Sequence, residues 1–333
     1  MRLRRGMIAL LSGTALLLSG LLSGCGIGLG TAGGYVPSGR LAGPLAGVKS
    51  LDGASIGVGS KNFTEQILLG KMAVILLRAA GADAKDLTNI PGSAAARQAQ
   101  LSGQIQAQWE YTGTAWLTYL GHDKPIPDEH RQYVAVRDED LAKNGLSWLP
   151  PAPMNDTYDM AITQATKKKY GITKLSEIKK VPVKDRTFCV ESEFTNRPDG
   201  LKGMLAKYGV PLGSPNGVPR SNLHTLQTGA IYQATARGDC TFGEVFTTDG
   251  RILALHLTPL QDDRSFFPKY NGCLVVTKSV MDKYPQIAQL FAAVSRKLTN
   301  QVLLKLNAQV DVDGDEPAQV AFDWLKSQGF ISD

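Results

Sequence analysis

Lys61 stands between a predicted strand and a predicted helix. Residues 54–58 form a short apolar run typical of a buried strand, and residues 67–80 carry apolar side chains at helical spacing. Asn62 and Glu65 have the spacing of a capping box, which is typical of a helix N-terminus. The first N–H groups of a helix lack partners within it, and the Lys61 ammonium would lie next to them. We expect this turn to bind an anion such as a ligand carboxylate, although an ordinary turn with a solvated lysine fits the same residues.

A second group of polar and aromatic residues follows a later predicted strand. Residues 105–110 are predicted to be extended, and residues 109–116 hold three aromatic side chains and two threonines, among them Tyr111 and Thr114. Ligands of open α/β sheets bind beyond the ends of the strands. We therefore expect this stretch to contribute to a binding site.

The elements that would position these residues alternate between short strands and helices, which favours an α/β fold. A proline-rich stretch at residues 146–153 breaks the pattern, and residues 266–276 have the features of a return strand. We predict two α/β lobes joined by two hinge crossings, with residues 54–157 and 265–333 in lobe I and residues 158–264 in lobe II. Such lobes close over a ligand by hinge motion.

The N-terminal residues have the features of a secretory signal. Arginines at positions 2, 4 and 5 precede an apolar run over residues 7–22, and Leu22-Ser23-Gly24-Cys25 resembles the lipobox of bacterial lipoproteins. We expect residues 1–24 to be a signal peptide and residues 25–53 to be a lipidated cysteine and a flexible tether. This places the protein at the cell membrane, anchored through Cys25 on the extracytoplasmic face. A plain secreted protein or an uncleaved anchor is the alternative.

The charge of the chain gives no indication of nucleic-acid binding. The chain has 333 residues, with 36 Lys and Arg and 30 Asp and Glu. Removal of the three signal arginines leaves 33 basic residues against 30 acidic ones, a net charge of +3. No block of basic residues with interleaved aromatics is present.

Three cysteines remain after Cys25. An exported protein can keep a disulfide, and Cys189 and Cys240 lie in the same predicted lobe, so we favour this pair with Cys273 left over. Three buried free thiols are the alternative. No Cys-x-x-Cys spacing is present, so we expect no metal site or cofactor.

Patterns that could indicate an enzyme or a metal site are weak. Gly53 to Gly57 matches the Gly-x-Ser-x-Gly elbow of hydrolases, but Ser55 enters a predicted strand, whereas the elbow needs a strand before the serine. The four histidines lack metal-ligand spacing, and residues 311–315 resemble a turn between helices more than a calcium loop. We therefore do not expect an enzyme; a surface-anchored esterase acting through Ser55 is the remaining enzymatic alternative.

Several motifs resemble those of one protein family. They lie at residues 59–66, 110–114, 149–158, 197–200 (Arg197-Pro198-Asp199-Gly200), 248–251 and 267–271. The chain resembles the substrate-binding proteins of osmoprotectant ABC importers over residues 54–331. The resemblance implies a type II periplasmic-binding-protein fold, a quaternary-amine ligand such as glycine betaine, carnitine or choline, and delivery to membrane permease subunits, by a protein acting as a monomer without cofactor.

The resemblance also implies which residues bind the ligand. A quaternary ammonium has no N–H to donate and is held by aromatic faces, each contributing about 0.5 to 2 kcal/mol when desolvated. The family's cage for the cation falls on Tyr111, Tyr158, Phe246 and Tyr270, and its carboxylate site falls on Lys61, Thr114 and Arg197. Phe246 departs from the usual tyrosine and lacks its hydroxyl, so binding of an aromatic or other non-quaternary solute is the alternative.

Overall fold

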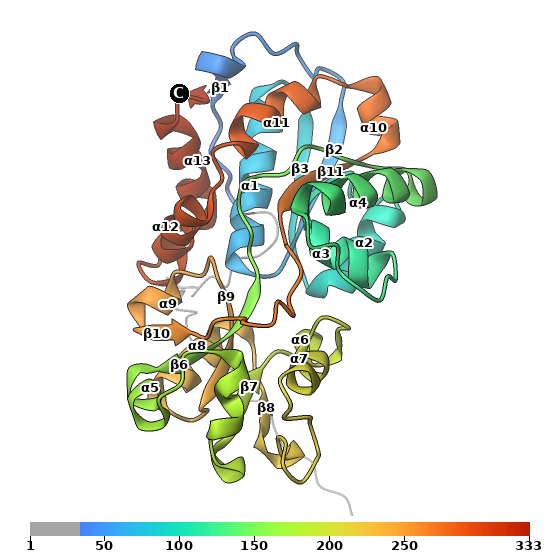
Figure 1. Cartoon of the computed structure of the whole chain (residues 1–333). Coiled ribbons are helices and arrows are strands. Elements are labelled where there is room, and N and C mark those ends of the chain that lie inside the picture. Colours follow the sequence, from blue (N-terminus) through green and yellow to red (C-terminus); the bar gives the residue numbers. More distant parts are fainter. Residues whose placement is uncertain (1–33) are drawn as a thin grey trace, which may run out of the picture. The chain divides into compact units, whose positions relative to one another are not determined.

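The structure, a computed structural model, describes residues 34–333. The predicted signal peptide and Cys25 lie outside the described residues. Two five-stranded sheets, each covered by its own helices, form two lobes within this part of the chain (Figure 1). In the described residues, no helix combines the length and the hydropathy that crossing a membrane requires.

Lobe I is built on a mixed sheet with the strand order β3-β2-β4-β11-β5. Strand β2 pairs in parallel with β3 and β4, whereas β11 is antiparallel to both β4 and β5. The elements of lobe I are β1 (Arg40–Leu41), η1 (Gly43–Leu45), β2 (Ser55–Lys61), α1 (Thr64–Ala79), β3 (Asp83–Ile90), α2 (Gly92–Leu101), β4 (Ala107–Tyr111), α3 (Thr112–Thr114), η2 (Ala115–Tyr119), α4 (Glu129–Asn144), β5 (Leu146–Trp148), β11 (Gly272–Thr277), α10 (Lys278–Lys283), α11 (Ile287–Ser295), α12 (Asn300–Asp311), α13 (Pro317–Ser327) and β12 (Ile331–Ser332).

Lobe II is built on a second mixed sheet with the strand order β10-β6-β9-β7-β8. Strand β6 is antiparallel to β9 and β10, and β7 is parallel to β8 and β9. The elements of lobe II are β6 (Tyr158–Thr163), α5 (Gln164–Tyr170), η3 (Leu175–Lys180), η4 (Val183–Asp185), β7 (Phe188–Val190), α6 (Ser192–Asn196), α7 (Leu201–Lys207), η5 (Arg220–Asn222), β8 (Leu223–Thr225), α8 (Thr228–Arg237), β9 (Phe242–Phe246), α9 (Arg251–Ala254) and β10 (Leu257–Pro259).

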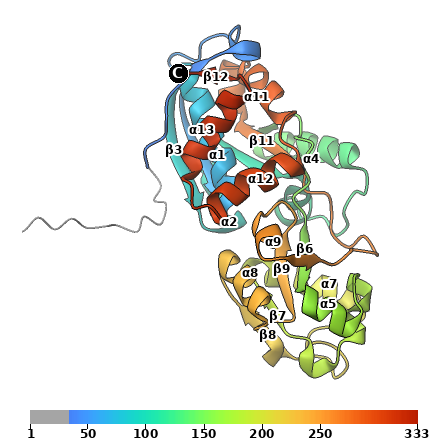
Figure 2. The ribbon, with the colours of Figure 1, turned by 90° about the vertical axis from the view of Figure 1, so that its left-hand side faces the viewer.

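The chain passes between the lobes twice. It leaves the first sheet after β5 and enters the second at β6, and it returns after β10 to form β11 (Figure 2). Residues 149–157 and 260–271 are the two crossings. The two-lobe prediction therefore agrees with the sheet topology, while the residue bounds given for each lobe remain a prediction.

Helix α1 is buried along most of its length. It packs between the first sheet and helices α12 and α13, which explains why its residues are apolar on more than one face. The predicted capping box is wrong, because the residue before the helix is Phe63 and no side chain caps the helix. The Glu65 carboxylate is fully buried, and it accepts hydrogen bonds from the hydroxyls of Tyr111 and Thr248 instead.

Part of the predicted tether belongs to lobe I. Strand β1 pairs with the C-terminal strand β12, and Leu45 and Leu51 are completely buried. The prediction of a flexible segment up to residue 53 is therefore wrong for residues 40–51. The glycine content suggested flexibility, but the three leucines at positions 41, 45 and 51 contribute to the core of lobe I.

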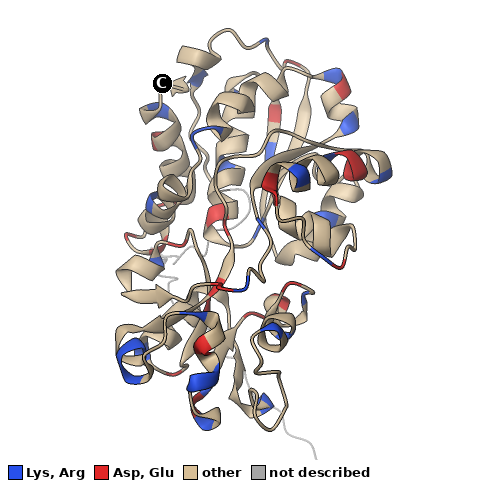
Figure 3. Ribbon diagram, viewed as in Figure 1, with Lys and Arg blue, Asp and Glu red and all other residues tan. Residues whose placement is uncertain are grey.

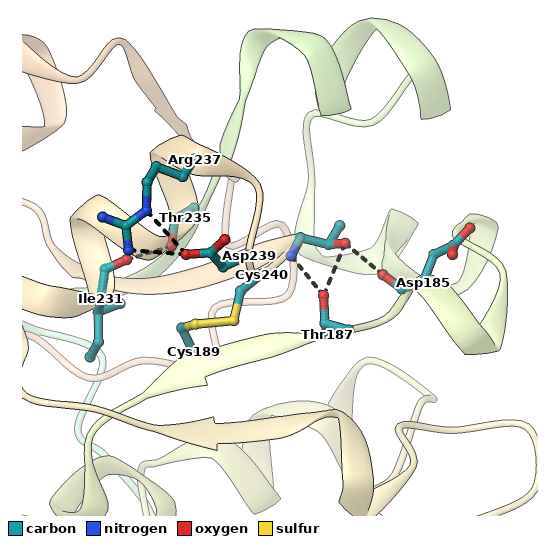
Figure 4. Close-up of a disulfide and its surroundings, with 9 residues drawn as sticks. Asp185, Thr187, Cys189, Ile231, Thr235, Arg237, Asp239 and Cys240 are labelled. Atoms are coloured by element: carbon teal, nitrogen blue, oxygen red, sulfur yellow. Dashed lines mark hydrogen bonds and ion pairs between the residues drawn. A yellow bond between two sulfur atoms is a disulfide. The ribbon is translucent and has the colours of Figure 1, made fainter.

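A disulfide joins Cys189 of β7 to Cys240, which precedes β9 (Figure 4). It is the pairing that the sequence favoured, and Cys273 is a buried free cysteine. Hydrogen bonds between Thr187 and Thr241 join the same two segments, in addition to the parallel pairing of β7 with β9. The bridge therefore fixes the strands on which the lobe II side of the site is built.

Candidate ligand-binding site

A pocket lies between the lobes and has an empty volume of about 480 Å³, open solvent at its mouth included. Both lobes and both crossings contribute to its wall. Its lining residues are Lys61, Asn62, Phe63, Gly92, Ser93, Tyr111, Thr114, Asp156, Tyr158, Glu191, Glu193, Thr228, Phe246 and Tyr270. Six of the seven ligand-binding residues predicted from the sequence are among them.

Arg197 is the predicted residue that does not line the pocket. Its guanidinium lies behind the wall, where it forms an ion pair with Asp199 and donates to the Thr114 hydroxyl over 3.3 Å. It also lies over the ring of Tyr158, at 5.4 Å from the centroid. Arg197 is 6% exposed and is not among the residues that line the pocket, so it supports the wall from behind.

Five aromatic rings line the pocket. Phe63 stacks between Tyr111 and Phe246, with centroid distances of 6.3 and 5.0 Å. Tyr158 lies 5.2 Å from Phe246, its partner across β6 and β9, and makes an edge contact with Tyr270 at 5.6 Å. The four predicted cage residues therefore lie together, and Phe63 joins them.

The ammonium of Lys61 already has a carboxylate partner. Its Nζ lies 2.5 Å from Oε1 of Glu110, which is completely buried on β4, and 4.8 Å from the centroid of the Tyr111 ring. The two residues meet because β2 and β4 are adjacent parallel strands. The anion that the sequence analysis expected beside Lys61 is thus a side chain of the protein itself.

The N-terminus of helix α2 is also occupied by the protein. The N–H of Gly92 donates to Oδ1 of Asn62, and the N–H of Ser93 donates to Oε2 of Glu193 from lobe II, both over 3.0 Å. Burial alone would raise the pKa of Glu193, but the bonds from Ser93 and the charges of Lys61 and Arg197 lower it below its usual value. An ionised carboxylate therefore crosses from one lobe to the other at this helix end.

Two further acidic side chains line the pocket without a basic partner. Among the described residues, no lysine or arginine forms an ion pair with Asp156 or Glu191. Burial raises the pKa of Glu191, and burial together with the charge of Glu65 raises the pKa of Asp156 well above its usual value. A cation in the pocket would favour the ionised form of both groups.

One hydroxyl connects two of the buried carboxyl groups. Oγ1 of Thr248 lies 2.5 Å from Oε2 of Glu65 and 2.7 Å from Oδ1 of Asp156. A hydroxyl has a single proton to donate, so both contacts are hydrogen bonds only when one carboxyl group is protonated. Burial raises the pKa of Glu65 too, which is consistent with such a shared proton between lobe I, lobe II and the first crossing.

Sequence reasoning missed Phe63 and the acidic residues of the wall. Phe63 and Asp156 stand inside motifs at residues 59–66 and 149–158 and could have been considered there. Glu191 and Glu193 lie in a polar stretch whose position against lobe I depends on how the two lobes pack together. Ser55 is the first residue of β2 and donates a hydrogen bond to Asp83, so it is not at the strand-to-helix turn that a nucleophile elbow needs.

Comparison with known proteins assigns the family. Residues 54–327 match the family model described as the substrate binding domain of an ABC-type glycine betaine transport system. The chain belongs to this family. Its fold is the type II periplasmic-binding-protein fold of two α/β lobes, and its function is extracytoplasmic substrate binding for an ABC importer of the glycine betaine class. The family is one of transport proteins and not a class of enzymes.

Individual family members show the same relationship. A glycine-betaine-binding protein of Pseudomonas aeruginosa is 34% identical over 284 residues, covering 83% of this chain and 88% of its own. The glycine betaine-binding protein YehZ of Escherichia coli is 31% identical, with 82% of this chain and 90% of its own covered. The solved structure of apo YehZ aligns with a TM-score of 0.62 at 28% identity, over 83% of this chain and 99% of that one.

Proposed function

We propose that the pocket between the lobes binds the quaternary ammonium group of an osmoprotectant within the rings of Phe63, Tyr111, Tyr158, Phe246 and Tyr270. The observation that carries the proposal is the gathering of these rings, from both lobes and the second crossing, around one pocket with acidic side chains in its wall. Ring faces attract a cation that has no hydrogen to donate, and they do so most strongly where water is excluded. The glycine-betaine-binding proteins among the relatives support the same class of ligand.

The roles of the aromatic residues depend on which lobe supplies them. Phe63 precedes helix α1 and Tyr111 is the last residue of β4, both in lobe I, whereas Tyr158 and Phe246 are paired residues on adjacent strands of lobe II. Closing the lobes would bring the two halves of the cage together on the ligand, and opening them would release it. Ligand capture and lobe closure would then be one event, which an importer's permease subunits can detect.

Alanine substitution of the cage tests the proposal. We expect Tyr158→Ala and Tyr111→Ala each to weaken the binding of the preferred quaternary amine by more than about tenfold, since each removes a ring that contacts the cation. Isothermal titration calorimetry measures the affinities. Tyr35→Ala is the matched control, because Tyr35 is 86% exposed and lies outside the pocket. Unchanged affinity in both pocket variants would contradict the proposal.

We also propose that the protein is held at the membrane through a lipid on Cys25 and acts as a monomer. The proposal rests on the signal-like residues 1–24 and the cysteine that follows them. We expect Cys25→Ser to move the protein from the membrane fraction to the soluble fraction of the cells that make it. Retention of the variant in the membrane fraction would argue against the lipid anchor.

A further inference from the structure

Five hydrogen-bond donors around the pocket are already used by the protein's own carboxylates. The Tyr111 hydroxyl donates to Glu65 over 2.7 Å, and the Tyr270 hydroxyl donates to Asp199 over 2.6 Å. The Thr228 hydroxyl donates to Glu191. With the Ser93 N–H on Glu193 and the Lys61 ammonium on Glu110, five donors of the wall each have a carboxylate partner.

The charges of the wall give the same picture. Lys61 is the basic residue that lines the pocket, and Glu110 balances it from behind. Arg197 lies behind the wall and is balanced by Asp199. Of the acidic lining residues, Glu193 is the one held in its ionised form, and it pairs with the already balanced Arg197, whereas burial raises the pKa of Asp156 and Glu191 and favours their neutral forms. The pocket therefore has an excess of negative charge.

A ligand carboxylate would meet this excess directly. To reach the N-terminus of α2 it would have to displace the Glu193 carboxylate, and to reach Lys61 it would have to compete with Glu110. The first step would leave the half-buried Glu193 without its helix N–H, and the second would leave the buried Glu110 without its ammonium, each next to a second negative charge. A ligand without a carboxylate avoids both costs, and a single positive charge reduces the charge excess.

We propose that this pocket selects quaternary ammonium cations that carry no carboxylate over zwitterionic betaines. This inference rests on the proposed function and specifies its ligand class. The ammonium group lies among the aromatic rings, and a hydroxyl or N–H at the other end of the ligand donates to the acidic wall that Glu191 and Glu193 form.

Choline and glycine betaine are the probes, because they share a trimethylammonium group and differ in a hydroxymethyl against a carboxylate. We expect calorimetric titration of the purified protein to give at least about tenfold tighter binding of choline. Equal or tighter binding of glycine betaine overturns the inference and leaves the proposed function in place. Absence of binding by both ligands to the folded protein overturns the inference and the proposed function together.

Glu193→Gln separates the role of charge from that of shape. This variant keeps the side-chain length and removes the carboxylate at the end of α2, so we expect the preference for choline over glycine betaine to fall by at least about tenfold. Asp138→Asn is the matched control, since it removes one negative charge from an exposed position on α4. A preference that Glu193→Gln leaves unchanged contradicts the assigned role of the acidic wall.

Discussion

Lys61 shows how a residue at a binding site can serve the structure of that site. Its side chain is 5% exposed, and its ammonium lies between the Glu110 carboxylate and the face of the Tyr111 ring. In this position it neutralises a buried carboxylate and fixes one ring of the cage. Its contribution to ligand binding would then be indirect, through Tyr111.

A substitution at Lys61 tests this role. We expect Lys61→Met to lower the free energy of unfolding by about 3 kcal/mol, because it leaves the Glu110 carboxylate buried without a partner. The double variant Lys61→Met with Glu110→Gln should recover most of the loss, since no buried charge remains. Urea denaturation measures both. A single variant as stable as the unchanged protein would show that Lys61 is available to a ligand anion.

Strand β6 carries Asp159, a buried aspartate with a raised pKa, at the start of lobe II. Burial raises the pKa of Asp159 to about 8. The charge of Asp262 adds to this effect, and the hydrogen bond from the Met160 N–H opposes it. The folded protein therefore keeps a proton that the unfolded chain loses near the ordinary aspartate pKa. Stability should fall as the pH rises between these two values.

A comparison of the stability of the unchanged protein and of Asp159→Asn at several pH values tests whether the pKa of Asp159 is raised. Between pH 5 and pH 8 we expect the stability of the unchanged protein relative to this variant to fall by up to about 1.4 kcal/mol per pH unit. Urea denaturation at several pH values gives the difference, and Asp138→Asn provides an exposed control. A difference that stays constant over this range would place the pKa of Asp159 near its usual value.

Helices α9 and α12 come into close contact at Gly250. A Cβ at this position would lie 2.5 Å from Cβ of Ala308 and 2.6 Å from its backbone nitrogen, so the backbones could not keep their present separation. Because α9 belongs to lobe II and α12 to lobe I, this contact helps to set the position of one lobe against the other. Arg251 and Thr64 both reach Asp311 close by.

Gly250→Ala should therefore disturb closure as well as folding. We expect ligand affinity to fall several-fold and stability to fall by about 1 to 3 kcal/mol, because the added methyl group forces the helices apart. Gly47→Ala is a suitable control, since a Cβ added at this position would have no non-neighbouring atom within 4 Å. Calorimetry and urea denaturation measure the two effects. Unchanged affinity in Gly250→Ala would mean that this contact does not hold the lobes together.

In the molecule as a whole, hydrogen bonds join the two lobes around the cluster of aromatic rings that lines the pocket. Glu193 with Ser93, Arg197 with Thr114, and Thr248 with Glu65 each join a residue of lobe II to one of lobe I. Basic and acidic residues are otherwise interspersed over both lobes (Figure 3). The lobes thus meet at the site where the ligand is expected and also where α9 contacts α12.

The sequence predicted the features that depend on neighbouring residues, and it missed those that depend on contacts between residues far apart in the chain. The strands, the helices and the position of Lys61 follow from local patterns, and the family motifs brought Tyr158, Phe246 and Tyr270 into one group. The partner of Lys61 could not be predicted, because it is on a strand 49 residues later. The acidic wall was missed for the same reason, since Glu193 meets Ser93 only through the packing of one lobe on the other.

A ligand and its uncharged-headgroup analogue test most directly whether the aromatic rings of the pocket bind a positive charge. The tighter binder of choline and glycine betaine is titrated against its carbon isostere, in which a neutral tert-butyl group replaces the trimethylammonium. The two groups have nearly the same shape and differ in charge. We predict that the isostere binds about a hundredfold more weakly or not at all. Equal affinities would contradict the cation cage and would leave an apolar pocket that selects its ligand by shape.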